Sequence, residues 1–244
     1  MIESTRNARV VAAARLKKAR ARRESGLLLL EGPNLLGAAL DAGVKVDAVF
    51  ALTEDELTDR ASRVGADVAL VTESVMKRLS DTESPRGPIA VAVAPPQQKI
   101  ASQDTVVLVS MSDPGNAGTL IRSAAAFGFQ IVATPDSVDL WSPKVLRSAA
   151  GAHFSTSIVV GATPEQVAEA GVALVALLPR DDGRPDPDPS AGPVGLLVGN
   201  EAHGLPKRLI QVAAASLTIP TENVESLNAA VAGSIAMFAV AQGR

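Results

Sequence analysis

Short apolar runs alternate with helix-like stretches through the second half of the chain, and this alternation constrains the fold most strongly. The runs have the length of buried strands, and glycines such as Gly128 end the helices between them. Parallel strands read as continuous apolar runs because helices cover both faces of their sheet. We therefore predict an α/β fold with a mostly parallel sheet. The expected strands are 105–110, 130–134, 155–160, 172–178, 194–198 and 217–219, and the expected helices are 117–127, 143–151, 206–214 and 227–241.

A smaller alternation of the same kind fills the first 95 residues and predicts a separate α/β domain. The polar, turn-rich residues 96–104 are the best linker candidate. The second domain then covers residues 105–244, with an exposed loop at 179–193, where five prolines and four aspartates gather. In the first domain, the expected helices are 4–23, 33–42, 55–64 and 73–79, and the expected strands are 27–31, 46–52, 68–71 and 89–94.

Composition excludes several classes of protein. The chain has no cysteine, so disulfides, thiol nucleophiles and cysteine metal sites are all excluded. No apolar stretch reaches the roughly 18 residues that a membrane span needs, and basic residues interrupt the N-terminal region where a secretion signal has its apolar core. No GxGxxG sequence joins a first strand to a helix, which argues against a dinucleotide-dependent oxidoreductase. We expect a cytoplasmic protein with no metal site.

Charge is distributed unevenly along the chain. Residues 1–23 hold eight Lys or Arg residues and one acid, whereas the rest of the chain carries a net charge of −10. A basic arm on an acidic body is typical of contact with a polyanion. The alternative is a solvated amphipathic helix, because Val10, Val11, Ala14 and Leu16 are able to pack on one face. The low aromatic content, with no tyrosine and one tryptophan, argues against an aromatic platform on which nucleic-acid bases would stack.

The final helix, 227–241, is apolar nearly all round. Such a helix has to be buried on more than one side. A symmetric dimer interface meets this requirement, and the alternative is a central core helix in a monomer. If the dimer interpretation holds, a charge at Ala236 or Val240 is expected to give monomers or insoluble protein.

Three polar segments carry the candidate chemistry, and the first is Asp113-Pro-Gly-Asn116 with the helix that follows. Asn116 lies at the expected N-cap position of this helix. Arg122 lies on the second turn among small neighbours, so it is able to reach across a groove, and helix N-termini attract phosphate. The alternative is that Asn116 only caps the helix and that Arg122 is a surface ion-pair partner.

The second and third segments follow strands near the end of the chain. Gly199-Asn200-Glu201 comes directly after an apolar strand, where open parallel sheets bind their ligands. Glu201 is a candidate to orient Arg122 or to contact substrate, and the alternative is a capping carboxylate; His203 is taken as a loop residue. In the third segment, Ser226 is a candidate N-cap of the last helix and Asn228 follows it, while Ile219-Pro220 ends a strand whose backbone groups are able to bind an adenine edge.

In this order the three segments resemble the motifs of the SpoU (TrmH-like) class of SPOUT methyltransferases, which move a methyl group from S-adenosylmethionine to a ribose 2′-hydroxyl of RNA. The resemblance implies a deep trefoil knot in the second domain. By similarity, the cofactor would contact Leu178, Gly199, Asn200, Ile219 and Leu227, and the catalytic set would be Asn116, Arg122, Glu201, Ser226 and Asn228. The chain departs from the class at Ala202, where glycine is common, and in the spacing from Ile219 to Leu227, which is one residue shorter and lacks a usual glycine.

The first domain more loosely resembles the ribosomal-protein-like (L30e/L7Ae-like) RNA-binding domain of members that act on ribosomal RNA. The resemblance therefore favours 23S ribosomal RNA as substrate; the alternatives are a transfer RNA 2′-O-methyltransferase or a non-catalytic RNA-binding or ribosome-assembly protein. Arg122 suits stabilisation of negative charge, because a guanidinium hardly deprotonates. Glu201, an RNA phosphate and water remain candidates for the general base.

Overall fold

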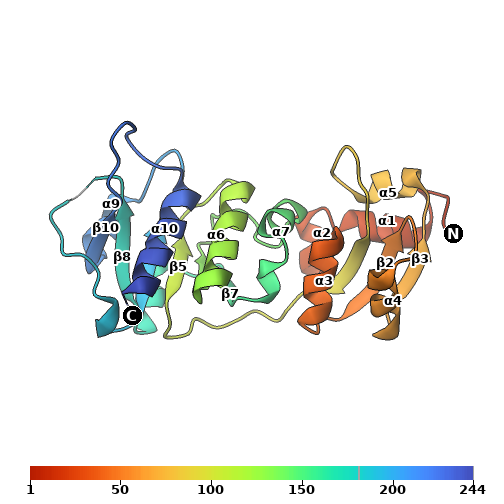
Figure 1. Cartoon of the computed structure of the whole chain (residues 1–244), viewed down its shortest axis with the longest axis horizontal. Helices are drawn as coiled ribbons and strands as arrows, with labels where there is room; N and C mark the ends of the chain where they lie inside the picture. Colours follow the sequence, from red (N-terminus) through yellow and green to blue (C-terminus); the bar gives the residue numbers. More distant parts are fainter. Residues whose placement is uncertain (181, 244) are drawn as a thin grey trace. The chain divides into compact units, whose positions relative to one another are not determined.

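The computed structural model describes residues 1–180 and 182–243 (Figure 1). Asp181, in the predicted loop 179–193, and Arg244, the last residue of the predicted second domain, lie outside the described residues. The chain folds as two compact units. The first contains Met1–Pro96 together with Trp141–Phe154, and the second contains Gln97–Leu140 together with Ser155–Arg244.

The first unit is built on a four-stranded mixed sheet in the order β1-β4-β2-β3. β4 runs antiparallel to β1 and β2, and β2 runs parallel to β3. Successive residues of β1 face opposite sides: Leu28 and Leu30 belong to one core cluster and Leu29 to the other, as the two-residue period of a strand requires. The strands are β1 (Leu27–Glu31), β2 (Val46–Ala51), β3 (Asp67–Leu70) and β4 (Ile89–Val93).

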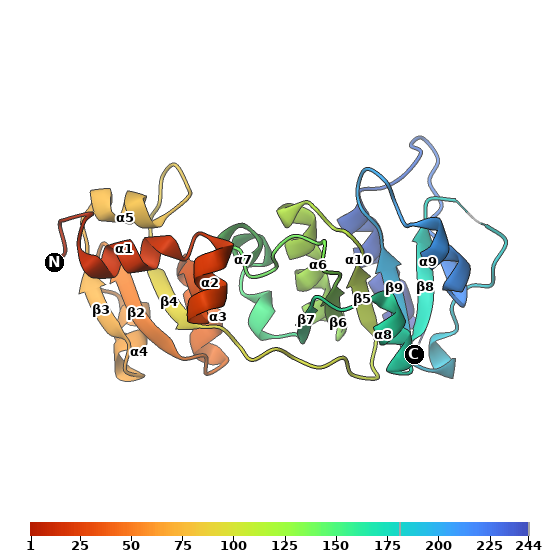
Figure 2. The same cartoon turned by 180° about the vertical axis from the view of Figure 1, so that it is seen from behind.

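Helices cover both faces of this sheet (Figure 2). Residues of α3 (Pro33–Asp41) and α4 (Glu56–Arg63) pack in the cluster that contains Leu28 and Leu30. Residues of α1 (Ala8–Arg15) and α5 (Glu73–Leu79) pack in the other cluster. The sheet is therefore buried between two helical layers, which gives the unit its own core.

The basic arm is part of this core rather than a free tail. The predicted helix 4–23 is interrupted, and it forms α1 and α2 (Ala19–Ser25). Val10 is fully buried and Leu16 is 4% exposed, so the apolar side of α1 packs against the sheet. Gly26 ends α2 in the left-handed conformation, which glycine adopts without strain. The apolar side of the arm is thus fixed, and most of its basic residues face solvent, with Arg22 buried.

Residues 141–154 correct the predicted domain boundary. The sequence placed them in the second domain, but α7 (Pro143–Ala149) packs on β1 and in the core of the first unit. Leu146 is fully buried in the cluster that contains Leu28, and Trp141 and Phe154 pack against the same cluster. Arg147 also forms an ion pair with Glu31, at 2.6 Å. The helical pattern predicted the helix, but it carried no information on which core the helix would join.

The second unit contains a fully parallel six-stranded sheet in the order β10-β8-β9-β5-β6-β7. All six expected strands are present, which confirms the mostly parallel sheet. Its strands are β5 (Thr105–Leu108), β6 (Gln130–Ala133), β7 (Ile158–Val160), β8 (Ala173–Leu178), β9 (Val194–Val198) and β10 (Ala215–Thr218), and its helices are α6 (Pro114–Phe127), α8 (Pro164–Glu169), α9 (Lys207–Val212) and α10 (Ala229–Gln242).

Sequence reasoning missed α8, although a signal for it was present. Thr163 and Gln166 form a capping box, in which each side chain accepts a hydrogen bond from the other residue's backbone N–H. The trefoil knot implied by the resemblance stays a prediction. Among residues 1–180 and 182–243, no helix combines the length and apolar character that a membrane crossing requires.

The last helix, α10, lies beside α6 (Figure 1). Gly233 permits this closeness, because a Cβ there would stand 2.5 Å from Leu120. Ala236 and Val240 are 0% and 2% exposed, so a charge at either would damage the protomer's own core. A charge at these two positions would therefore not distinguish loss of a dimer from loss of the fold, and the dimer stays a prediction. The exposed apolar residues of α10 form another stripe, made of Val231, Ile235 and Phe238.

We expect Leu146→Ala to destabilise the protein by about 2–4 kcal/mol, because it leaves a cavity in the core of the first unit. Denaturant unfolding followed by the fluorescence of Trp141 measures this. Lys144→Ala is the matched control, since Lys144 is exposed on the same helix and its loss should change stability by less than about 0.5 kcal/mol. Equal unfolding midpoints for the two variants would contradict the assignment of α7 to this core.

Candidate functional site

The candidate site lies at the carboxyl ends of the parallel strands of the second unit. The three polar segments follow β5, β9 and β10, and the chain that leaves β8 joins them there. In open parallel sheets, ligands bind at this edge because loops and helix N-termini gather beyond the strand ends. Residues from distant parts of the chain thus meet around one cavity.

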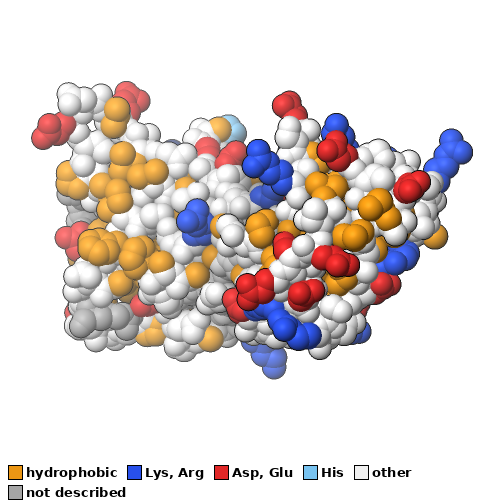
Figure 3. Space-filling model, turned by 45° about the vertical axis from the view of Figure 1, so that its right-hand side comes forward, with side chains coloured by type: hydrophobic (Ala, Val, Ile, Leu, Met, Phe, Trp, Pro, Cys, Tyr) orange, Lys and Arg blue, Asp and Glu red, His pale blue; other side chains and the backbone are white. Residues whose placement is uncertain are grey.

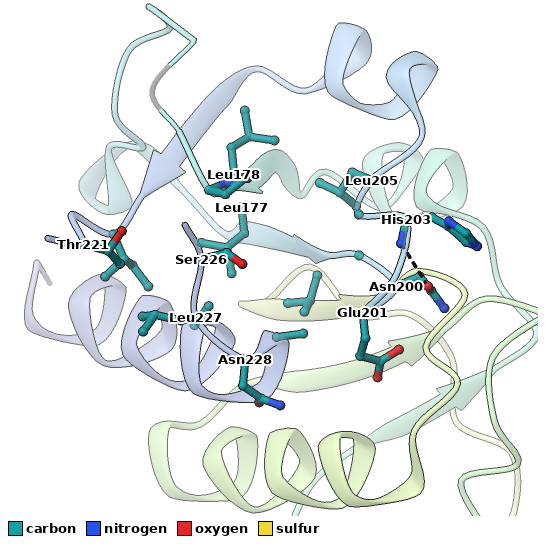
Figure 4. Close-up of a pocket in the computed structure, with 17 residues that line it drawn as sticks. Leu177, Leu178, Asn200, Glu201, His203, Leu205, Thr221, Ser226, Leu227 and Asn228 are labelled. Atoms are coloured by element: carbon teal, nitrogen blue, oxygen red, sulfur yellow. Dashed lines mark hydrogen bonds between the residues drawn. The ribbon is translucent and has the colours of Figure 1, made fainter. Parts of the chain in front are cut away.

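The cavity has a volume of about 650 Å³ (Figure 4). This is within the range of about 300–1,000 Å³ that is usual for sites that bind cofactors and drug-sized ligands. All five residues of the predicted cofactor set line it, and so do Glu201, Ser226 and Asn228 of the predicted catalytic set. Lining residues that sequence reasoning did not assign to the cofactor or catalytic set include Leu177, Pro179, His203, Leu205, Thr221 and Ala232.

Gly199 is required by the close approach of two backbone segments. A Cβ on Gly199 would lie 2.4 Å from the carbonyl carbon of Gly204, a separation that Cβ atoms do not adopt. The backbone N–H of Gly204 donates to the carbonyl of Asn200, at 2.8 Å, and closes a tight turn. The turn brings His203 and Leu205 to the cavity wall. In Figure 4 the His203 ring points away from the other labelled residues.

Glu201, Asn116 and Asn228 form a chain of hydrogen bonds beside the cavity. Asn116 Nδ2 donates to Glu201 Oε1 at 2.9 Å, and Asn228 Nδ2 donates to Asn116 Oδ1 at 3.0 Å. A carboxylate only accepts, so Glu201 fixes the orientation of the Asn116 amide, which in turn fixes that of Asn228. Asn228 Oδ1 then accepts from the N–H groups of Ala230 and Val231 and caps α10.

Two further donors engage the carboxylate of Glu201. The Ser112 hydroxyl donates at 3.1 Å and the Asp113 backbone N–H at 3.3 Å. Partial burial alone would raise the pKa of Glu201, but the hydrogen bonds from Asn116, Ser112 and Asp113 outweigh it, so the pKa lies below its usual value of 4.5. Glu201 is therefore ionised at neutral pH. Its side chain meets these donors and not Arg122.

The helix caps differ from the predicted ones. Asp113, not Asn116, caps α6: its carboxylate accepts from the Asn116 backbone N–H at 2.7 Å. This arrangement leaves the Asn116 side chain available to Glu201. Asn228, not Ser226, caps α10, which therefore begins at Ala229. Ser226 is exposed at the cavity and makes no hydrogen bond within the described part of the chain.

Arg122 lies apart from the other predicted catalytic residues. It is exposed on α6, does not line the cavity, and makes no hydrogen bond or ion pair with any residue that the structure describes. The following residue, Ser123, shares a hydrogen bond with Ser234 of α10. Arg122 is thus a cation free to meet a ligand. No group of His, Asp or Glu side chains within the described ranges could hold a metal ion.

Comparison with known proteins identifies the family. The model of the SpoU rRNA methylase family matches residues 104–238. The chain belongs to this family. A second model, the MRM3-like substrate binding domain, matches residues 7–90. The family resemblance seen in the sequence is confirmed, and the chain is an RNA methyltransferase that uses S-adenosylmethionine.

Similar proteins match nearly the full length of the chain. The 23S rRNA (guanosine(2553)-2′-O)-methyltransferase RlmP of Bacillus subtilis is 30% identical, with 97% of each chain covered. An uncharacterized tRNA/rRNA methyltransferase of Synechocystis is 31% identical over 97% of this chain and 92% of its own. The crystal structure of the AdoMet-bound rRNA methyltransferase from Sinorhizobium meliloti is 28% identical, with a TM-score of 0.86 and coverage of 99% of this chain and 97% of that chain.

The pKa of Glu201 is lower in the folded protein than the usual value of 4.5, so the ionised carboxylate stabilises the folded site. This stabilisation is complete at neutral pH. It is lost as the pH falls below about 4.5 and through the folded pKa, because the carboxylate becomes protonated. Glu201→Gln removes this charge at every pH. We expect the variant to bind S-adenosylmethionine more weakly, by about threefold to tenfold, since charge-assisted hydrogen bonds contribute about 1.5–3 kcal/mol and solvent screens part of this at an exposed side chain. Titration calorimetry at pH 7 measures the affinity, and an unchanged value would contradict the role of the charge.

Proposed function

We propose that this protein transfers a methyl group from S-adenosylmethionine to a ribose 2′-hydroxyl of 23S ribosomal RNA. The observation that carries the proposal is the cavity bordered by the ordered Glu201, Asn116 and Asn228 side chains. The name of the B. subtilis relative supports both the 2′-hydroxyl and the 23S RNA. A transfer RNA substrate is the second candidate, because the Synechocystis relative is named for both RNAs.

The chemistry explains why such a site is needed. A ribose 2′-hydroxyl is a weak acid and therefore a poor nucleophile, so the protein must orient it and stabilise the negative charge that develops on its oxygen. The cofactor, when bound, supplies a methyl group on a positively charged sulfur. Gly199, Ile219 and Leu227 would hold it, in a cavity whose backbone and apolar side chains suit an adenine ring.

Arg122 and Glu201 then have distinct roles. Arg122 would stabilise charge and bind an RNA phosphate, because its guanidinium cannot act as a base at neutral pH. Glu201 is a weak base, since its pKa is lowered and its oxygens already accept hydrogen bonds, so we assign it to positioning. With Glu201 assigned to positioning, the remaining candidates to accept the proton of the 2′-hydroxyl are an RNA phosphate and water.

Recruitment of RNA is assigned to the solvent side of α1 and α2. Among the eight basic residues there, Arg9, Lys17 and Arg20 form ion pairs, and Arg22 is buried and donates to backbone carbonyls. The exposed residues without a partner in the described structure are Arg6, Arg15, Lys18 and Arg23. These four cations are the best candidates for phosphate contacts.

A homodimer through α10 completes the proposal. In Figure 3, orange side chains gather over the second unit. Val231, Ile235 and Phe238, spaced along one side of α10, are 46%, 41% and 50% exposed. Phe238 packs edge-to-face on Phe127 of α6, with ring centroids 5.9 Å apart. An exposed apolar stripe of this kind supports an interface at this helix. We also propose that the protein is located in the cytoplasm, together with the ribosomal RNA.

The activity is tested with radiolabelled S-adenosylmethionine and RNA from a strain that lacks the gene. We expect label in 23S RNA at one 2′-O-methyl position that is missing in that strain. Arg122→Ala should abolish transfer and leave cofactor affinity within about twofold, because Arg122 does not line the cavity. Label in transfer RNA instead would select the second substrate, and a parallel loss of cofactor affinity would refute the role of Arg122.

RNA affinity against salt tests the basic surface. Deleting residues 1–23 is not suitable, because Val10 and Leu16 belong to the core. Neutralising Arg15, Lys18 and Arg23 to Gln should weaken binding and reduce the slope of log affinity against log salt by about two to three, since each phosphate contact contributes about 0.7–0.9. The same change at three other exposed cations should leave the slope unchanged. These control residues are Arg63, Lys77 and Arg78.

For the dimer, Ile235→Glu should give monomers at micromolar concentration by sedimentation, because it places a charge in the exposed stripe. Val212→Glu is the control, since Val212 is an apolar residue 59% exposed on a different helix, α9. A wild-type protein that sediments as a monomer would remove the dimer from the proposal.

A further inference from the structure

Ser110 has an unusual backbone at the edge of the site. It follows β5 closely, and its φ of +53° places it in the left-handed region. Ser110 and Ala150 are the two non-glycine residues with positive φ among those that the structure describes. A side chain in this conformation is strained, and such strain persists where surrounding contacts hold the residue in place.

Three groups hold Ser110. Its backbone N–H donates to Thr134 Oγ1 at 2.9 Å, and its carbonyl accepts from Asn200 Nδ2 at 2.8 Å. Its hydroxyl donates to the Asp136 carboxylate. Asp136 also accepts from the Thr134 hydroxyl at 2.6 Å, so one carboxylate fixes both residues. These bonds hold the pKa of Asp136 below its usual range, so the acceptor is charged at neutral pH.

Ser110 is connected to the site by its hydrogen bond with Asn200. Because Asn200 Nδ2 is given to the Ser110 carbonyl, Asn200 Oδ1 faces the other way and accepts from the backbone N–H groups of Ala202 and His203, at 2.9 and 3.3 Å. These bonds shape the turn that carries Glu201. Ser112, two residues after Ser110, donates to Glu201 from the other side. The conformation of Ser110 therefore aligns both segments that meet at Glu201.

We propose that Asp136 is a positioning residue for methyl transfer: it holds Ser110 in the left-handed conformation, and Ser110 in turn fixes the Asn200–Glu201 turn at the cofactor cavity. Asp136 belongs to none of the three polar segments and lies in the loop after β6. The proposal rests on the proposed function for its effect on transfer, but its effect on cofactor affinity is independent of the RNA.

Glycine substitution separates this role from a general loss of stability. Glycine adopts positive φ without strain, so Ser110→Gly should not need the Asp136 carboxylate. Ser110→Ala keeps the Cβ and loses the hydroxyl, so it should behave like Asp136→Ala. The test measures the affinity for S-adenosylmethionine by calorimetry and kcat/KM for RNA. All variants are assayed at a temperature at which their melting curves show them folded.

We expect Asp136→Ala and Ser110→Ala each to lower cofactor affinity and kcat/KM by about tenfold. Ser110→Gly should stay within about threefold of wild type, and in the Ser110→Gly background Asp136→Ala should lower either quantity by less than about threefold, because only its hydrogen bond from Thr134 is then left to lose. Ala150→Gly, which relieves the other strained residue, should leave both quantities unchanged.

An Asp136→Ala variant with wild-type affinity and turnover would overturn the proposal. An equal loss in the Ser110→Gly background would overturn it too, because Asp136 would then act by another route. If the wild type transfers no methyl group to RNA while cofactor affinity follows the expected order, the proposed function fails and the positioning role of Asp136 stands on the affinity measurements.

Discussion

The charge of Glu201 is the constraint on which the arrangement of the site depends. The Glu201 carboxylate accepts three hydrogen bonds, and Ser112, Asp113 and Asn116 provide them from a segment more than eighty positions away in the sequence. Because the carboxylate only accepts hydrogen bonds, it sets the direction of the Asn116 amide and, through it, that of Asn228. One ionised group thus orders two segments and the first turn of α10.

Close packing of small residues makes this meeting of segments possible. Gly199 allows the backbone of Gly204 to cross beside it, and Gly233 lets α10 lie against Leu120 of α6. Both glycines have ordinary φ values, so they are required by space and not by backbone conformation. A side chain at position 199 would push the Gly204 backbone away and break the turn, whereas one at position 233 would force the Leu120 side chain to move. Packing and site chemistry therefore depend on the same residues.

The core of the first unit includes part of the chain that the family pattern assigns to the methylase domain. The SpoU model covers residues 104–238, yet α7 packs on β1 and Arg147 pairs with Glu31 of the first unit. The chain therefore passes between the units three times, at 96–97, 140–141 and 154–155. A first unit that ended at residue 96 would lack α7, whose apolar residues pack in its core.

The sequence by itself determined the α/β class, the parallel sheet and the family. Buried strands and capped helices leave local patterns, and the three polar segments are contiguous in the chain. Through the family resemblance it also named five residues that line the cavity as cofactor contacts, although other lining residues such as Leu177 and Thr221 were missed. Only the tertiary structure decided that Asp113 and Asn228 are the caps, that Glu201 meets Asn116 rather than Arg122, and that α7 joins the first unit. The physical reason is that each of these outcomes depends on which donors or apolar surfaces lie nearby in space. The order of residues along the chain does not specify these neighbours.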